Sequence, residues 1–285
     1  MINGFYSMWT KPSKVRLGTN KKYIYEMEDF EVITMILSVA AYERYNGPTK
    51  MYADEDACAY LDKTGLASMF HRGVELIGVS EEIDPLVFWA AGKLVALSKE
   101  QGASAMIDLD LIIWKDLAKC IGENPVYVIH REELNPVIYP DPHVFECNEG
   151  YSMPEEWDFS VLPANTALLY TSSEEFRKYY TSAALAFMKG CAPSKDNLNR
   201  MVFAEQRLLP ICAKAMGLGV GSYVKSVSEL REQTVFTHIW GHKDVLKYNL
   251  QEREQYIRRC LKRLKYDFPD YYVYAAGVKE LQRYV

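Results

Sequence analysis

The chain has 285 residues, of which 49% are hydrophobic and 25% charged, and its formal net charge is −5 at pH 7. This composition is typical of a folded protein with a large core and excludes an intrinsically disordered chain. The negative charge argues against nucleic-acid partners, because a protein that neutralises many phosphates needs a basic surface.

The first half of the sequence alternates short apolar runs with longer helical patterns, which is typical of βαβ units and a largely parallel sheet. Asp84 and Pro85 provide a suitable N-cap and first turn for a helix that reaches Glu100. Before this helix we expect strands at 2–7, 49–53 and 74–79 and helices at 30–45 and 54–64.

The second half is more mixed. Residues 135–157 are rich in proline, aromatic and polar side chains, which predicts a long irregular excursion that could shape a substrate pocket. Pro193 predicts a break between two helices. The expected elements are strands at 125–130 and 161–170 and helices at 174–188, 201–216 and 252–265.

The last of these helices is basic. A solvated helix face is the favoured interpretation of this charge, and contact with a membrane surface is the alternative. The residues concerned are Arg258, Arg259, Lys262, Arg263 and Lys265.

The six cysteines are scattered and lack the spacing of zinc ligands, so we expect free thiols. The first residues do not resemble a signal peptide, and no apolar stretch is long enough to span a bilayer. These features predict a cytoplasmic protein without a transmembrane segment.

Asp108 and Asp110 interrupt an apolar run at 105–113. Residues i and i+2 of a strand lie on one face, so the two carboxylates would be adjacent unless the strand ends between them. Unpaired anions in apolar surroundings are costly, and a divalent cation such as Mg²⁺ or Mn²⁺ removes that cost. The pair therefore predicts a metal site for a phosphorylated substrate. The alternative is that the carboxylates cap a helix beginning near Trp114 or form salt bridges at a strand end.

The helical segment 88–97, followed by 106–117 with its two aspartates, resembles the helix and DXD block of nucleotide-sugar transferases and capsular polysaccharide synthesis proteins. Together with the order of the elements, this block resembles the GT-A fold of nucleotide-sugar-dependent glycosyltransferases. The resemblance implies a Rossmann-like α/β fold, with a mostly parallel central sheet flanked by helices and a mixed second half.

Three further segments occur in matching order. Asn165-Thr-Ala-Leu-Leu-Tyr is similar to the N-x-G strand motif of such enzymes, with alanine in place of glycine. Glu205-Gln206 resembles the acidic-Gln motif of the glycogenin and lipopolysaccharide galactosyltransferase group, with glutamate in place of aspartate. His238-Ile-Trp-Gly-His-Lys243 resembles the H-x-x-G-x-x-K element of the same group and is one residue shorter before its lysine.

The resemblance implies a Mn²⁺ or Mg²⁺ ion bound by Asp108, Asp110 and His238, with Asp108 also able to contact the ribose. Lys243 would contact the diphosphate of the donor. For His238 the alternative is a buried imidazole that is satisfied by hydrogen bonds. Lys93 would face the donor phosphates or pair with an aspartate, and a partly exposed helix lysine is the alternative.

Two residues near the first strands are weaker candidates for the donor site. Asp54 would bind the nucleobase and ribose, and N-capping of the helix at 54–64 explains it equally well. Trp9 would stack on the base, and simple packing is the favoured alternative.

Glu205 would lie near the transferred sugar, and a solvent-facing helix carboxylate is the alternative. Gln206 and Asn165 would form hydrogen bonds with sugar hydroxyls. The resemblance thus implies a nucleotide-diphosphate sugar as donor, a saccharide or other hydroxyl acceptor, and retention of the anomeric configuration.

We expect one domain over 1–285, with a nucleotide-binding half at 1–120, an acceptor-binding and metal-completing part at 121–250 and a helical extension at 251–285. Two other functions compete with sugar transfer. A metal-dependent hydrolase or nucleotidyltransferase would need a water-activating carboxylate or a second metal cluster. A GT-A-shaped binding or scaffold protein would have lost its catalytic site.

Overall fold

The computed structural model describes residues 1–18, 23–192, 197–225 and 227–285. Its centre is a seven-stranded sheet of order β3-β2-β1-β4-β7-β6-β8, in which the described strands are parallel except for β7. The predicted α/β fold with a mostly parallel sheet is therefore confirmed. The strands are β1 (Asn3–Met8), β2 (Thr49–Ala53), β3 (Val74–Leu76), β4 (Ser104–Ile107), β6 (Val126–Val128), β7 (Leu168–Thr171) and β8 (Val220–Ser222).

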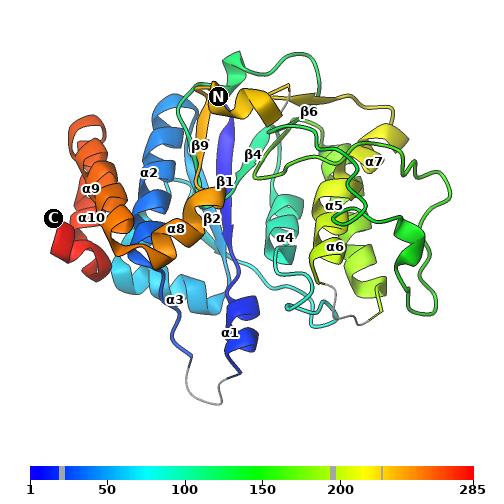
Figure 1. The fold of residues 1–285 in the computed structure, drawn as a ribbon, viewed down its shortest axis with the longest axis horizontal. Helices are drawn as coiled ribbons and strands as arrows, with labels where there is room; N and C mark the ends of the chain where they lie inside the picture. Colours follow the sequence, from blue (N-terminus) through cyan, green and yellow to red (C-terminus); the bar gives the residue numbers. More distant parts are fainter. Residues whose placement is uncertain (19–22, 193–196, 226) are drawn as a thin grey trace.

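Helices cover both faces of this sheet (Figure 1). Alternate strand residues enter two separate cores, as Tyr6 and Phe5 show, because successive side chains of a strand point to opposite faces. One face carries α2 (Asp29–Tyr45), α3 (Glu55–Thr64), α9 (Leu250–Asp267) and α10 (Pro269–Gly277). The other carries α4 (Ala91–Lys99), α5 (Glu174–Gly190) and α7 (Leu208–Ala215). Of two short helices, α1 (Lys11–Leu17) lies below the end of β1 in Figure 1, and α8 (Lys243–Tyr248) lies to the left of β2.

A second, two-stranded ribbon pairs β5 (Leu111–Ile113) with β9 (Phe236–His238) in antiparallel fashion. Its first strand packs against α2, and the hydroxyl of Ser38 on that helix donates a hydrogen bond to the Leu111 carbonyl. The ribbon was not among the expected elements, and it joins segments far apart in the sequence, with Leu111 paired to His238 and Ile113 to Phe236.

Two expected boundaries were wrong, and so was the helix-capping alternative for Asp108 and Asp110. The helix expected from Asp84 begins at Ala91. The carbonyl of Asp84 accepts the N–H groups of Val87 and Phe88 in a separate turn, and the side chains of these two residues are buried in the core. The strand expected at 161–170 begins at Leu168, because the preceding backbone pairs outside the sheet, as the Ala164 N–H does with the Gln206 carbonyl at 3.0 Å. No helix begins at Trp114, which instead follows β5.

The helix expected at 201–216 is interrupted. It consists of α6 (Asn197–Val202), a π-helical segment at Phe203–Arg207 and α7. Pro210 has no N–H group, so it cannot serve the carbonyls of Glu205 and Gln206 five and four residues before it. Two donors from other segments replace the missing N–H group. The Tyr180 hydroxyl donates to the Glu205 carbonyl at 2.6 Å, and the N–H of Ala164 donates to the Gln206 carbonyl. The break expected at Pro193 lies outside the described residues.

We expect Tyr180→Phe to destabilise the protein by about 1–3 kcal/mol, because it leaves the buried carbonyl of Glu205 without a donor. Urea unfolding measures this difference. The control is Tyr266→Phe on an exposed ring of α9, which should leave the midpoint unchanged. Equal midpoints for both variants would mean that the π-helical segment does not depend on this hydrogen bond.

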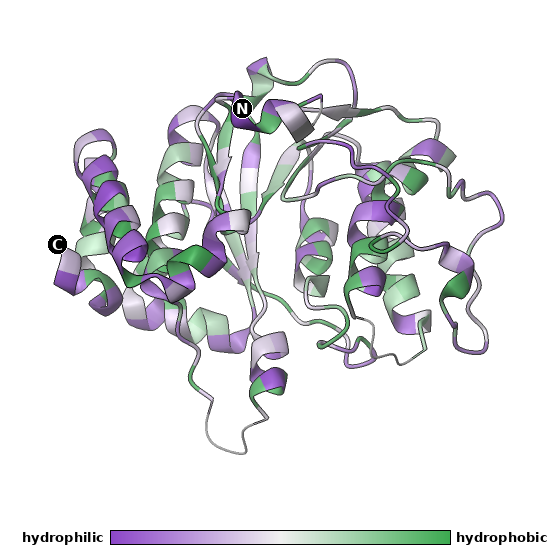
Figure 2. Ribbon diagram, viewed as in Figure 1, coloured by the Kyte–Doolittle hydropathy of each residue, from purple (hydrophilic) through white to green (hydrophobic). Residues whose placement is uncertain are grey.

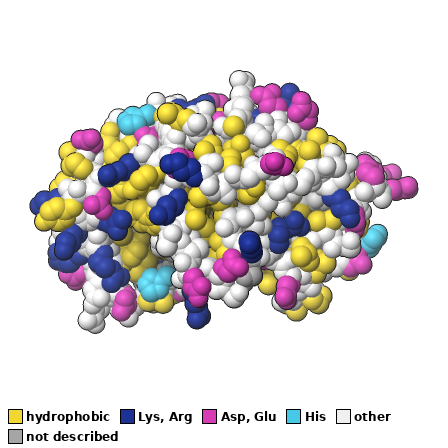
Figure 3. All heavy atoms as spheres, turned by 90° about the horizontal axis from the view of Figure 1, so that it is seen from above, with side chains coloured by type: hydrophobic (Ala, Val, Ile, Leu, Met, Phe, Trp, Pro, Cys, Tyr) yellow, Lys and Arg dark blue, Asp and Glu magenta, His cyan; other side chains and the backbone are white. Residues whose placement is uncertain are grey.

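The basic helix α9 buries only its apolar stripe and is drawn as largely hydrophilic in Figure 2. All five of its basic residues named above are exposed. Acidic side chains lie among the basic ones at this end of the molecule (Figure 3). This mixed charge supports the solvated-face interpretation. Within the described chain, no helix is both long and apolar enough to cross a membrane.

Candidate metal centre

The candidate site lies where the direction of strand addition reverses. The chain adds β2 and β3 on one side of β1 and then returns to place β4 on the other side. In open α/β sheets, ligands bind beyond the carboxyl ends of the strands at such a switch point. Asp108 directly follows β4 and Trp9 directly follows β1. Because β1 runs from the N-terminus at the top of Figure 1 towards α1, this edge is the lower one.

The β5–β9 ribbon brings His238 to the two aspartates. Leu111 is paired with His238, and the N–H of Ile239 donates to the carbonyl of Asp110 at 3.1 Å. His238 Nε2 consequently lies 3.6 Å from Asp110 Oδ2. Asp108, Asp110 and His238 each offer a ligand atom within 4.8 Å of the others.

The donor set fits a divalent cation. The two carboxylates suit a hard divalent cation such as Mn²⁺ or Mg²⁺, and the imidazole in the set makes Mn²⁺ the better fit of the two. His238 Nε2 and Asp110 Oδ2 are buried and have no hydrogen bond of normal geometry among the described residues, although Lys243 Nζ lies 2.9 Å from Oδ2 as an ion pair. Buried polar atoms without such partners are rare in folded proteins, so His238 Nε2, which has no cation beside it as Asp110 Oδ2 does, points to a ligand between the side chains.

The electrostatics of the two aspartates differ. Burial raises the pKa of Asp108, and the negative charges of Asp110 and Glu205 raise it further against the opposing effect of Lys93. Burial also acts to raise the pKa of Asp110, but the contacts with His238 and Lys243 outweigh it and hold that pKa well below its usual range. Asp110 is therefore the carboxylate that is ionised under all ordinary conditions.

Lys93 joins the metal cluster to Glu205. Its Nζ lies 2.6 Å from Asp108 Oδ1 and 2.5 Å from Glu205 Oε1. Burial acts to lower the pKa of Lys93, but Asp108 and Glu205 outweigh it and raise that pKa, so the ammonium stays charged. The Thr166 hydroxyl donates to the same Glu205 oxygen at 2.9 Å. Sequence reasoning missed Thr166, although it follows Asn165 within the motif quoted above.

Gln206 contacts the irregular excursion at Tyr139, and Asn165 contacts Glu132 just before the excursion begins. Asn165 Nδ2 donates to Glu132 Oε1 at 3.3 Å. The Tyr139 hydroxyl lies 2.6 Å from the other Glu132 oxygen and 2.5 Å from Gln206 Oε1. Tyr139 was not singled out in the sequence, because nothing in its neighbourhood indicates which residue it meets. The excursion thus supplies polar groups next to Glu205.

Asp54 and Trp9 lie at the same sheet edge with other partners. The Asp54 carboxylate caps α3 by accepting the N–H of Ala57 at 3.0 Å, and it also accepts the N–H of Thr10 at 2.7 Å. These are the contacts of the N-cap alternative. Trp9 packs against α4 so closely that a Cβ on Gly92 would lie 2.6 Å from the Trp9 Cβ. A role for either residue in binding the donor stays a prediction.

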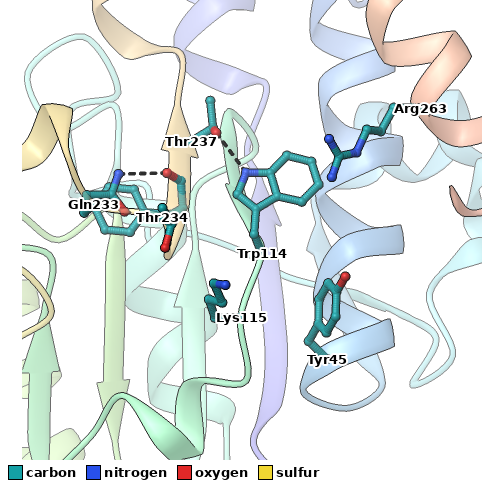
Figure 4. Close-up of a pocket in the computed structure, with 8 residues that line it drawn as sticks. Tyr45, Trp114, Lys115, Gln233, Thr234, Thr237 and Arg263 are labelled. Carbon is teal, nitrogen blue, oxygen red and sulfur yellow. Dashed lines mark hydrogen bonds between the residues drawn. The ribbon is translucent and has the colours of Figure 1, made fainter.

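A separate pocket of about 460 Å³ lies at the other end of the β5–β9 ribbon (Figure 4). Trp114 stands between Thr237, which accepts its indole N–H at 2.8 Å, and Arg263, whose guanidinium lies 4.7 Å from the ring centroid. None of the candidate metal ligands lines this pocket. This pocket and the cluster of Asp108, Asp110 and His238 therefore lie at opposite ends of the β5–β9 ribbon.

No protein family model and no curated protein matches the chain. Solved structures do match. The bifunctional glycosyltransferase WbbM is 10% identical at a TM-score of 0.39, and the match covers 78% of this chain and 38% of WbbM. The galactosyltransferase LgtC, solved with donor and acceptor sugar analogues, is 11% identical at a TM-score of 0.39, with 78% and 73% covered.

A nucleoside-diphosphate-sugar pyrophosphorylase from Vibrio cholerae RC9 is 12% identical at a TM-score of 0.41, with 80% of this chain and 93% of that protein covered. The similarity to glycosyltransferases expected from the sequence motifs is thus found among solved structures. The chain spans little more than a third of the length of WbbM.

Proposed function

We propose that the chain transfers a sugar from a nucleotide-diphosphate sugar to a hydroxyl group of a saccharide acceptor, with Mn²⁺ or Mg²⁺ held by Asp108, Asp110 and His238. One observation carries this proposal: three suitable ligands from segments far apart in the sequence converge at the switch point of the sheet, beside two lysines. When bound, the cation would neutralise the diphosphate as it leaves the sugar.

The two lysines have different roles in this proposal. The Lys243 side chain is 40% exposed, so it can reach the donor diphosphate from solvent while it stays near Asp110. Lys93 is shared between Asp108 and Glu205. We therefore propose that the main role of Lys93 is to position these two carboxylates. Any contact between its ammonium group and the donor phosphates would be made while it stays between Asp108 and Glu205.

Glu205 is the group proposed to face the sugar that is transferred, where positive charge develops on the anomeric carbon. Its side chain is 8% exposed and is fixed by Lys93 and Thr166, so it is preorganised rather than free. Gln206 and Asn165 would complete the polar surroundings of the sugar hydroxyls.

We expect Glu205→Gln to lower the rate of sugar transfer at least about 100-fold while nucleoside diphosphate affinity stays within a few-fold, because Glu205 is not one of the metal ligands. Release of nucleoside diphosphate from the donor measures the rate, and calorimetry measures the affinity. Glu82→Gln removes a carboxylate from a surface pair with Lys189 and is the matched control. Equal rates for the two variants would remove Glu205 from the reaction.

A thermal-shift screen tests the proposal as a whole. UDP, GDP, ADP and CDP are each added with and without Mn²⁺, because a ligand that binds the folded state raises its melting temperature. A shift that requires both nucleotide and metal supports the transferase. No shift with any of the four favours the scaffold alternative. Donor cleavage at a rate that no saccharide acceptor alters favours a hydrolase. The anomeric configuration of the product then tests the predicted retention.

A further inference from the structure

Cys147 and Cys191 face each other across a short antiparallel bridge that contains none of the candidate metal ligands. The N–H of Asn148 donates to the Gly190 carbonyl at 2.7 Å, and the N–H of Ala192 donates to the Glu146 carbonyl at 2.9 Å. These bonds flank the two cysteines, which are therefore a non-hydrogen-bonded pair. Such pairs have Cα atoms about 4.5 Å apart and side chains on the same face.

That spacing lies within the range of disulfide bonds, whose Cα atoms are roughly 4.4–6.8 Å apart. Both thiols are free in the structure. Cys147 is exposed, whereas Cys191 is buried and receives a hydrogen bond from the Arg200 guanidinium, with Nε 2.9 Å from Sγ. Burial raises the pKa of the Cys191 thiol above its ordinary value, and the Arg200 guanidinium offsets part of that rise. The sulfur of Cys147 is thus accessible to solvent, and the sulfur of Cys191 is hydrogen-bonded to the positively charged Arg200 side chain.

We propose that Cys147 and Cys191 form a reversible disulfide, which makes the bridge a site of oxidative modification. With hydrogen peroxide as the oxidant, the exposed Cys147 thiolate attacks one peroxide oxygen, the O–O bond breaks, and a sulfenic acid and hydroxide result. The Cys191 thiolate then attacks the Cys147 sulfur, and a second hydroxide leaves as the S–S bond forms. The two protons lost by the thiols convert the hydroxides to two waters, and peroxide is the species reduced.

The disulfide would fasten the irregular excursion to the end of α5. Phe145, two residues before Cys147, packs on Phe203 with ring centroids 5.1 Å apart, and Phe203 begins the π-helical segment that carries Glu205. Tyr139 of the same excursion contacts Gln206. The modification therefore closes a covalent loop over residues 147–191 and fixes the excursion next to the segment that carries Glu205, without using any residue assigned to the sugar site.

The experiment treats the fully reduced protein with hydrogen peroxide and, separately, with oxidised glutathione. We expect the intact mass to fall by two hydrogen atoms, four of the six thiols to remain titratable, and a proteolytic digest to contain a peptide that links Cys147 to Cys191. Because the bond closes a long loop, the melting temperature should rise by roughly 5 °C or more and return to its starting value after reduction.

Cys147→Ser and Cys191→Ser should each abolish both the linked peptide and the rise in melting temperature. Cys147 is exposed, so its variant remains informative if the buried substitution impairs folding. Cys120→Ser, at a half-buried thiol outside the bridge, is the matched control and should retain the link. Absence of the linked peptide under both oxidants, a link to a different cysteine, or oxidation that stops at sulfinic acid on Cys147 would overturn the proposal.

Discussion

Asp110→Asn is expected to lower the Mn²⁺-dependent affinity for nucleoside diphosphates at least about 100-fold while the protein stays folded. Asp110 is the carboxylate whose pKa is held low by His238 and Lys243, so it supplies the permanent negative charge of the cluster. The amide keeps the size of the side chain but is a much weaker ligand for a hard cation. Without that charge, His238 and Asp108 alone hold the ion poorly.

The fold should tolerate this change. The backbone carbonyl of Asp110 keeps its bond from Ile239, and the ribbon pairing of Leu111 with His238 does not involve the carboxylate. Lys243 loses its partner, but at 40% exposure it remains hydrated. Circular dichroism and the melting temperature without metal should therefore resemble those of the wild type.

The matched control is Asp141→Asn. Asp141 also pairs with a histidine, His143, at 2.7 Å, but both side chains are exposed and neither belongs to the metal cluster. Calorimetry with Mn²⁺ and the nucleoside diphosphate that binds the wild type should give an unchanged affinity for this control. If Asp110→Asn behaves like the control, the three converging ligands do not form the metal site and the glycosyltransferase proposal loses its main support.

Local patterns accounted for much of the fold because their causes are local. Asp54 caps α3 and Gly65 ends it in a left-handed conformation at φ 74°, as the residue types indicated. The strand that ends at Asp108 was visible as an apolar run bounded by a carboxylate. These features depend on neighbours within a few residues, which a single sequence displays.

The contacts that assemble the candidate site are long-range, and their partners could not be derived from patterns. The three-residue strand β9 has no periodicity to detect, yet its pairing with β5 decides where His238 lies. The π-helical segment depends on Tyr180, far from Pro210 in the sequence, and the helix expected at 201–216 did not take account of that proline. Resemblance to a known family, rather than periodicity, placed His238 near Asp110.

The link between Lys93 and Glu205 leads to the second large effect. We expect Lys93→Met to destabilise the protein by about 3–5 kcal/mol, because it leaves Asp108 and Glu205 as neighbouring carboxylates without their shared cation. Both partners are mostly buried, with side-chain exposures of 26% and 8%, so water can replace the ammonium only in part. Lys99→Met, on the same helix and paired with Glu75 at the surface, should cost little and is the matched control.

Two conditions distinguish this effect from lost packing. Unpaired buried carboxylates have pKa values raised above those of the unfolded chain, so they stabilise the fold only when protonated and cost stability as pH rises. The deficit of Lys93→Met in urea unfolding should therefore be larger at about pH 8 than at about pH 5. Mn²⁺ should restore part of the free energy of unfolding that Lys93→Met loses, because the cation neutralises Asp108. The loss caused by Lys99→Met should not change when Mn²⁺ is added. A deficit that neither acid nor Mn²⁺ reduces would mean that Lys93 contributes its methylene packing rather than its charge, and that Asp108 is not part of a cation site.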